Sequence, residues 1–295
     1  MNDLGFLQSL EKIKALIGLL SLSTKRGDKF SRDDWLKKVN LDCLMKAKNI
    51  VESELDVCNS MSLLASSRHL FEMSIWVKLV NKNSDYALIY YLEGLNNNIQ
   101  HYKKYVEQLQ IESEFLLDID EKQSELIVQQ REYLLKNSDS MTDKERSNYV
   151  SNSIKNFDTQ FSLDNAFSLY FDNARVQGFK RTSDHIIDNE IPRFLAKVAE
   201  LELEKVELLN KLSSEQRDLV PSNKNRWRWD LKASETGMTK EYKFIYSYTS
   251  KLLHATPMSI STDQQDLMQQ ESDMFIRYIN YKMNQLVDMI YTPGI

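Results

Sequence analysis

The sequence predicts an all-α protein, a multi-helix bundle with a long, projecting antiparallel helical hairpin. Only 7 Gly and 4 Pro interrupt 295 residues. Leu, Lys, Glu, Gln and Ser dominate, as is typical of long helices joined by short loops. Apolar residues also recur every three to four positions over long stretches, which favours amphipathic helices over strands. The length allows one large helical domain or two smaller ones.

The first predicted helix covers residues 4–22. Its apolar face is formed by Phe6, Leu10, Ile13, Ile17 and Leu20. Three charged residues interrupt the apolar run, namely Glu11, Lys12 and Lys14. The run is therefore too short for a membrane-spanning helix, and we interpret it as a core or docking helix that ends in a polar turn at residues 25–28.

The next two predicted helices lead to the first candidate site. Ser31 or Asp33 is expected to cap the first of them. The second, from about residue 41, is either continuous or bent near residues 59–60. It ends at a polar loop of residues 81–85.

A long helix is predicted from residue 86 to about residue 136. Shorter helices are expected at 142–156 and 163–179, the first of them opened by a capping box of Thr142 and Glu145.

Pro192, a favoured first-turn residue, is expected to open a helix whose apolar residues alternate at spacings of four and three. Segments 99–136 and 192–218 are predicted to pair as the hairpin. The alternative is that both are ordinary bundle helices with a wide apolar face.

Residues 213–240 are predicted to be the one extended irregular stretch. A helix then carries Tyr246, Ser250 and His254 and stops before Pro257, and residues 263–291 form the last helix. The predicted organisation is a bundle in two parts with the hairpin region inserted between them: residues 1–98, 99–218 and 219–295.

Charge and cysteine content exclude several classes of protein. The net charge of −5 and the pI near 5.6 give no global positive field for a long duplex. Cys43 and Cys58 are interpreted as free thiols in a reducing compartment. The four histidines lack metal-ligand spacing, so neither a metal nor a cofactor is expected. No signal or anchor is recognised, so we expect a cytoplasmic protein without membrane contact.

Arg68 and Glu72 stand out because they lie on the apolar face of their own helix, on the line of Leu64, Phe71 and Ile75. Burying a charge costs several kcal/mol unless a partner compensates it, so the pair is either a structural ion pair or a site. Arginine offers five fixed donors suited to phosphate or carboxylate. The neighbouring His69 is interpreted as peripheral.

Tyr246, Ser250 and His254 form a second polar stripe, because residues four apart share one helical face. His254 can act as a general acid or base with Ser250 or Tyr246 fixing its tautomer. The alternative is a histidine that bonds the last carbonyls of its helix. If the two stripes face each other, Arg68, Glu72, Ser250 and His254 form a cluster suited to an anion.

Two further patterns suggest nucleic-acid chemistry. Arg226, Trp227 and Arg228 interleave cations with an indole, as in sites for single-stranded nucleic acid; the alternative is tryptophans that pin a loop to the core. Arg181 and His185 are one residue closer than the Arg-x4-6-His spacing of HEPN ribonucleases, and we interpret them as surface residues.

The order Arg68-x-x-x-Glu72, then Trp227 and Trp229, then Tyr246-x-x-x-Ser250-x-x-x-His254 resembles a bacterial helical family catalogued as domain of unknown function 5677. The resemblance covers residues 60–95 and 225–260. It implies a helical bundle with a polar pocket, distantly HEPN-like, in proteins suspected of roles in defence or stress.

Three hypotheses follow. In the first, the pocket cleaves RNA without metal: His254 moves the proton, Arg68 stabilises the phosphorane, and Glu72 and Ser250 position them. In the second, the protein is non-catalytic and binds a partner or a second copy through 99–136 and 192–218. In the third, the pocket, with Tyr246 as a further ligand contact, senses a nucleotide or another small anion.

Overall fold

The computed structural model describes residues 3–23, 31–54, 59–161, 168–221, 227–253 and 267–291. These residues form helices joined by turns and short segments, without a strand among them, so the predicted all-α fold is confirmed. Within the described ranges, no helix is both long enough and apolar enough to cross a membrane.

The chain forms two compact units. Unit 1 consists of residues 1–94 and 208–295, and unit 2 of residues 95–207. The sequence had suggested boundaries at 98/99 and 218/219. Both observed boundaries fall inside helices, Gly94 within Tyr86–Lys136 and Glu207 within Ile191–Lys211.

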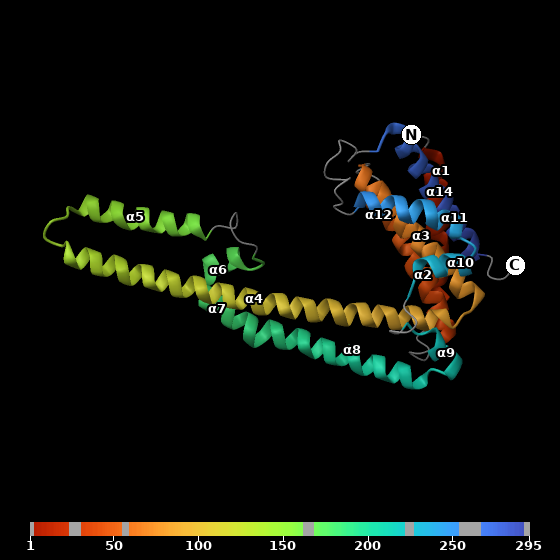
Figure 1. Ribbon diagram of the computed structural model, residues 1–295, viewed down its shortest axis with the longest axis horizontal. Coiled ribbons are helices and arrows are strands. Elements are labelled where there is room, and N and C mark those ends of the chain that lie inside the picture. The colour runs from red at the N-terminus through yellow and green to blue at the C-terminus, as the bar shows by residue number, and fades with distance from the viewer. Residues whose placement is uncertain are drawn as a thin grey trace. The chain divides into compact units, whose positions relative to one another are not determined.

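Unit 1 contains the shorter helices near both ends of the chain, the start of the helix Tyr86–Lys136 and the end of the helix Ile191–Lys211 (Figure 1). Its complete elements are α1 (Asp3–Ser23), α2 (Arg32–Asn49), the π-helix η1 (Ile50–Glu54), α3 (Ser60–Lys82), α9 (Ser214–Leu219), α10 (Trp229–Glu235), α11 (Thr239–Glu241), the π-helix η3 (Tyr242–Tyr246), α12 (Ser247–Leu253) and α14 (Gln269–Tyr291). Their apolar faces share one core, in which Ile13, Leu44, Phe71, Phe275 and Leu286 are fully buried.

The ends of α2 and α3 follow from their caps. Ser31 caps α2, because its hydroxyl accepts a hydrogen bond from the backbone N–H of Asp34. Of the two predicted caps, Ser31 and Asp33, the first is therefore confirmed. The separate helix predicted from about residue 41 is wrong in its start, since α2 runs unbroken from Arg32 to Asn49. Asn59 accepts the N–H of Ser62 and begins α3 as a new helix.

The predicted irregular stretch at 213–240 is corrected, because it contains α9, α10 and the start of α11. Ser213 and Gln216 form a capping box that nucleates α9. Gln216 also donates to the Asp85 carboxylate, with 2.9 Å between Nε2 and Oδ1, which connects α9 to the turn before Tyr86. The predicted turn at 25–28 and the predicted stop at Pro257 lie outside the described residues.

Unit 2 is built along one long helix (Figure 1). Its elements are α4 (Tyr86–Lys136, from residue 95), α5 (Asp143–Gln160), α6 (Phe171–Gln177), α7 (Phe179–His185), the π-helix η2 (Ile186–Glu190) and α8 (Ile191–Lys211, to residue 207). The predicted bounds of α4 and the predicted capping box of Thr142 and Glu145 are confirmed.

Two helices, α8 and α5, pair with successive stretches of α4. The predicted hairpin paired α4 with α8 alone. In Figure 1, α8 lies beside one stretch of α4 and α5 beside its last turns. Tyr102 stacks on Phe194 of α8 at 5.7 Å, and Tyr133 stacks on Tyr149 of α5 at 4.2 Å, both between ring centroids. The antiparallel partner of residues 99–136 is therefore shared between two segments.

The region before α8 departs from prediction for a backbone reason. Gly178 has a φ of 100° and separates α6 from α7, so the helix predicted at 163–179 does not extend through it. The π-helix η2 ends two residues before Pro192, which has no N–H and whose ring conflicts with the carbonyl four residues earlier. The wider turn lets α7 continue into α8.

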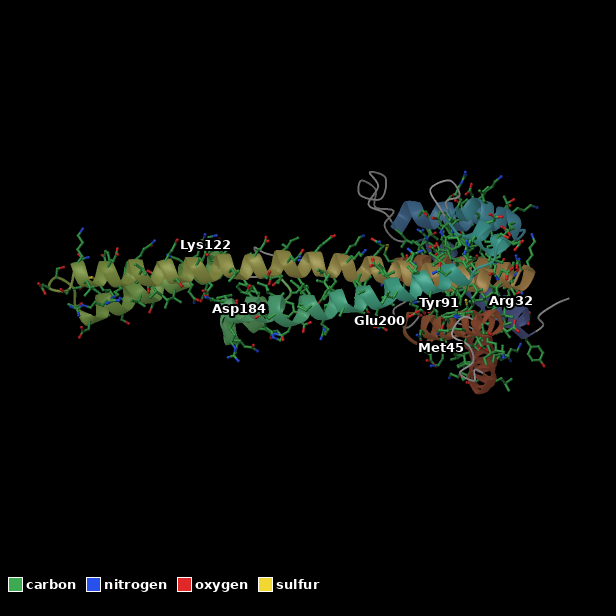
Figure 2. The ribbon with its side chains drawn as sticks, turned by 90° about the horizontal axis from the view of Figure 1, so that it is seen from below. Arg32, Met45, Tyr91, Lys122, Asp184 and Glu200 are labelled. Atoms are coloured by element: carbon green, nitrogen blue, oxygen red, sulfur yellow. The ribbon has the colours of Figure 1, made fainter. Side chains whose placement is uncertain are left out.

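Within unit 2, much of the surface of α4 stays exposed to solvent. Glu112 is buried there and accepts the backbone N–H groups of Leu169 and Tyr170 at 3.0 and 3.1 Å. Figure 2 shows many side chains standing out along this unit, among them the exposed Lys122 on α4 and Glu200 on α8.

Candidate functional site

The two polar stripes of the sequence meet in unit 1. Nε of Arg68 donates to Oε1 of Glu72 at 3.0 Å, one terminal nitrogen donates to Ser250 Oγ at 3.2 Å, and the other donates to Tyr246 Oη at 3.1 Å. The guanidinium carbon also lies 4.5 Å from the centre of the Tyr246 ring. The predicted convergence of Arg68 and Glu72 with Tyr246 and Ser250 is confirmed.

Local structure fixes this cluster. Arg68 and Glu72 are four residues apart on α3, and Tyr246 and Ser250 are four apart across η3 and α12, so each pair shares a helical face. Tyr242 stacks on Tyr246 at 4.8 Å between ring centroids. The side chains of Arg68 and Glu72 keep 22% of their surface exposed, so the cluster is largely buried but open to solvent at one side.

The bonding leaves donors unused. A guanidinium has five N–H groups, and three of those of Arg68 are engaged. Ser250 and Tyr246 both accept from Arg68, and among the described residues neither hydroxyl has an acceptor for its own proton. The cluster can therefore offer two N–H groups and two O–H groups to an additional acceptor.

A pocket of about 250 Å³ adjoins the cluster through Glu72. Its walls are largely apolar and include the rings of Trp76, Tyr90 and Trp229, and its charged groups come from α2 and α3; the lining residues are Asp42, Cys43, Lys46, His69, Glu72, Met73, Trp76, Tyr90 and Trp229. The interpretation of His69 as peripheral is thus incomplete, because the residue next to Arg68 lines this pocket.

Burial sets the proton affinities inside this pocket. It raises the pKa of the Cys43 thiol to about 12, with the nearby Asp42 carboxylate adding to the effect. Burial likewise raises the pKa of Tyr90 well above its usual range. Both groups are neutral near pH 7, so Cys43 is an unreactive, protonated thiol.

The remaining predicted ligand residues are engaged elsewhere or lie outside the described residues. Trp227 stacks on Trp76 at 4.3 Å between ring centroids and packs on the core. Arg228 is exposed, and its guanidinium pairs with the Asp230 carboxylate at 2.5 Å. The structure thus shows the tryptophan pinning its segment to the core, the alternative given above. Arg226 and His254 lie outside the described residues.

Arg181 and His185 belong to α7 in unit 2. Both are exposed, and His185 contacts Asn189 at 3.2 Å through Nδ1. Their interpretation as surface residues is confirmed.

Sequence reasoning missed a second ion pair, in which a fully buried lysine meets a partly exposed glutamate. Lys282 on α14 is fully buried, and its Nζ lies 2.5 Å from the Glu241 carboxylate and 2.7 Å from Gln285 Oε1. Tyr278 also donates to Glu241, at 3.1 Å. Burial lowers the pKa of Lys282, and the Glu241 partner opposes that shift. The pattern held a signal, since Lys282 follows Phe275 and Ile279 on one apolar face.

No group of three His, Cys, Asp or Glu side chains able to hold a metal ion occurs within the described part of the chain. Comparison with family models, curated proteins and solved structures found no match to this chain. The resemblance to domain of unknown function 5677 therefore stays a prediction.

Proposed function

We propose that unit 1 binds a small oxyanion, of the size and charge of a phosphate group, at the cluster of Arg68, Tyr246 and Ser250. The observation that carries the proposal is the bonding of the guanidinium. Among the described residues its one charged partner is Glu72, whereas its two terminal nitrogens face neutral hydroxyls whose protons have no acceptor there.

The chemistry of these groups suits an anion. Two guanidinium N–H groups and two hydroxyls can donate together to the oxygens of one phosphate, and bonds from a charged donor are the stronger ones. Glu72 holds the guanidinium by its Nε edge, so the terminal edge is oriented before a ligand arrives. The adjoining aromatic pocket can take the uncharged part of a larger ligand, such as the base of a nucleotide.

The catalytic form of the proposal adds His254, which follows Ser250 by four residues in the sequence. In this form the imidazole transfers the proton during cleavage of an RNA phosphodiester and Arg68 stabilises the charge that develops. Its support is the sequence spacing alone. A role in bacterial defence or stress response stays a prediction from the resemblance.

Titration of the full chain with inorganic phosphate and with a nucleoside monophosphate, followed by tryptophan fluorescence, tests the binding. Trp76 and Trp229 line the adjoining pocket and supply the signal. Arg68→Lys keeps the charge but loses the planar donor set, and we expect it to weaken binding about tenfold. Arg277→Lys on the exposed face of α14 is the matched control and should bind as the unaltered protein does.

Tyr246→Phe and Ser250→Ala separate binding from structure. If they weaken phosphate binding while the fold persists, the hydroxyls serve the ligand. If the three cluster variants bind phosphate as well as the Arg277→Lys control does, the cluster is a structural contact between α3 and α12. Cleavage of single-stranded RNA that His254→Ala abolishes would support the catalytic form; cleavage that survives in this variant would contradict it.

A further inference from the structure

Unit 2 contains a second pocket, of about 490 Å³, between the end of α4 and the start of α5. The lining residues from α4 are spaced as one helical face: Ile127, Gln130, Arg131, Leu134 and Leu135. Ser138 from the following turn and Arg146 from α5 complete the lining. The volume lies in the range of small-molecule sites.

Two buried donors in this pocket have no acceptor among the residues that the structure describes. The side chain of Gln130 is 91% buried, since its exposed fraction is 9%, and its Nε2 has no hydrogen-bond partner. Nε of Arg146 is also buried and without a partner. The terminal nitrogens of Arg146 are used, one by the carbonyl of Ser138 and one by the Asp143 carboxylate at 3.6 Å. Buried donors are normally satisfied, so these two indicate a missing acceptor.

The charge of the lining indicates which acceptor fits. Arg131 and Arg146 are both cationic, and no acidic residue lines the pocket. Among the described residues, Arg131 has no carboxylate within ion-pair distance. The chain as a whole carries a net charge of −5, so this pocket is a local exception that favours an anion.

The other walls are apolar and unusually open. Ile127 is 59% exposed and Leu135 is 67% exposed, and Leu134 lies between them on the same face of α4. An ordinary inorganic anion would leave this apolar surface in water. A ligand with an anionic head and an apolar body would cover it.

We propose that unit 2 binds a small amphiphilic carboxylate in this pocket. The carboxylate oxygens accept from Gln130 Nε2 and Arg146 Nε, and Arg131 compensates the charge at the rim. The apolar body lies against Ile127, Leu134 and Leu135. The site is independent of the Arg68 cluster, and its ligand need not share the chemistry of the oxyanion proposed for unit 1.

Calorimetric titration of the full chain with decanoate, below its micelle-forming concentration, tests this proposal. The expected result is binding of one decanoate, with Gln130→Leu and Arg131→Gln each weakening it about tenfold. Arg131 is exposed, so its replacement is expected to leave the fold intact. Arg181→Gln, an exposed arginine on α7 of the same unit, is the matched control and should leave the affinity unchanged.

Three results would overturn the proposal. The first is no measurable binding of decanoate, which would mean that water alone satisfies the two donors. The second is equal binding of decyltrimethylammonium, which has the same apolar chain with a positive head. The third is an equal loss of affinity in the Arg181→Gln control, which would show general attraction to positive charge.

Discussion

Arg68 in unit 1 and Arg146 in unit 2 have contrasting surroundings. All three nitrogens of Arg68 have partners, and two of these partners lie 178 and 182 residues later in the sequence. Within the described part of the chain Arg146 has local partners only, and its buried Nε has none. The guanidinium of Arg68 thus joins two distant segments and still keeps two N–H groups for the proposed oxyanion. Arg146 is bonded within its own local segment and leaves a buried Nε donor unmet, which indicates a ligand of a different kind.

The largest effect is expected at the buried pair of unit 1. Glu241→Ala leaves the fully buried Lys282 without its carboxylate, and we expect a loss of about 3–5 kcal/mol in the free energy of unfolding. Denaturation followed by tryptophan fluorescence measures unit 1, because all four tryptophans (Trp35, Trp76, Trp227 and Trp229) belong to it.

Glu11→Ala, at an exposed glutamate on α1, is the control for that measurement and should change stability by less than about 0.5 kcal/mol. The double variant Glu241→Leu with Lys282→Met should recover most of the loss, since an apolar pair leaves no buried charge. Equal stability of Glu241→Ala and Glu11→Ala would show that the Glu241 carboxylate does not stabilise the buried Lys282.

The direct comparison comes from Arg68→Ala and Arg146→Ala. We expect the first to cost about 2–3 kcal/mol, because three hydrogen bonds from a charged donor are lost. The second should cost less than about 1 kcal/mol, because its bonds are local and partly exposed. Amide hydrogen exchange of α3 and of α5 measures the two effects separately, and similar losses in both helices would remove the distinction.

Alkaline pH should destabilise unit 1 through Cys43. In the folded chain burial holds the thiol neutral up to a pKa of about 12, whereas in the unfolded chain it ionises near its usual 9.0. Its contribution to stability is therefore complete below pH 9 and is lost as the pH rises from 9 toward 12. Relative to Cys43→Ala, we expect a loss of about 1.4 kcal/mol between pH 8 and pH 10.

Tryptophan-monitored denaturation of both proteins at the two pH values gives this difference. Tyrosines also titrate there, and the subtraction of the Cys43→Ala data removes their contribution. An identical pH dependence in the two proteins would show that Cys43 is not shielded from water.

The smallest expected effect is at Gln130. Gln130→Leu removes a buried donor that has no acceptor, so we expect unit 2 without ligand to be unchanged or stabilised by up to about 1 kcal/mol. Hydrogen exchange in the last turns of α4 measures it. A clear destabilisation would mean that Gln130 has an acceptor after all, and the contrast with Arg68 would disappear.

Much of the fold and part of the candidate site could be predicted from sequence periodicity. A charge on an apolar stripe located Arg68 and Glu72, and residues four apart gave the matching stripe of Tyr246 and Ser250. The same rule, applied to the last helix, would have found Lys282. The capping pattern of Ser213 and Gln216 would likewise have indicated α9, which lies in a stretch that was predicted to be irregular.

Other features depend on packing that no local pattern contains. The pairing of α4 with α8 and then with α5 is decided by which apolar faces meet in three dimensions. The unmet donors of Gln130 and Arg146 are visible only once their neighbours are known. His69 is exposed, and it lines a pocket because residues of α2 and Trp229 of α10 supply other parts of the wall, although its place on α3 lies away from the apolar stripe.

Both unit boundaries lie inside uninterrupted helices, at Gly94 in α4 and at Glu207 in α8. Proteases cut most readily at exposed, locally unfolded chain, and neither junction offers such a site while its helix is intact. Limited digestion of the native protein should therefore not release either unit as an intact fragment. A truncated protein that contains one unit alone would have to be cut within both α4 and α8. The cut helices would then fray at their new ends.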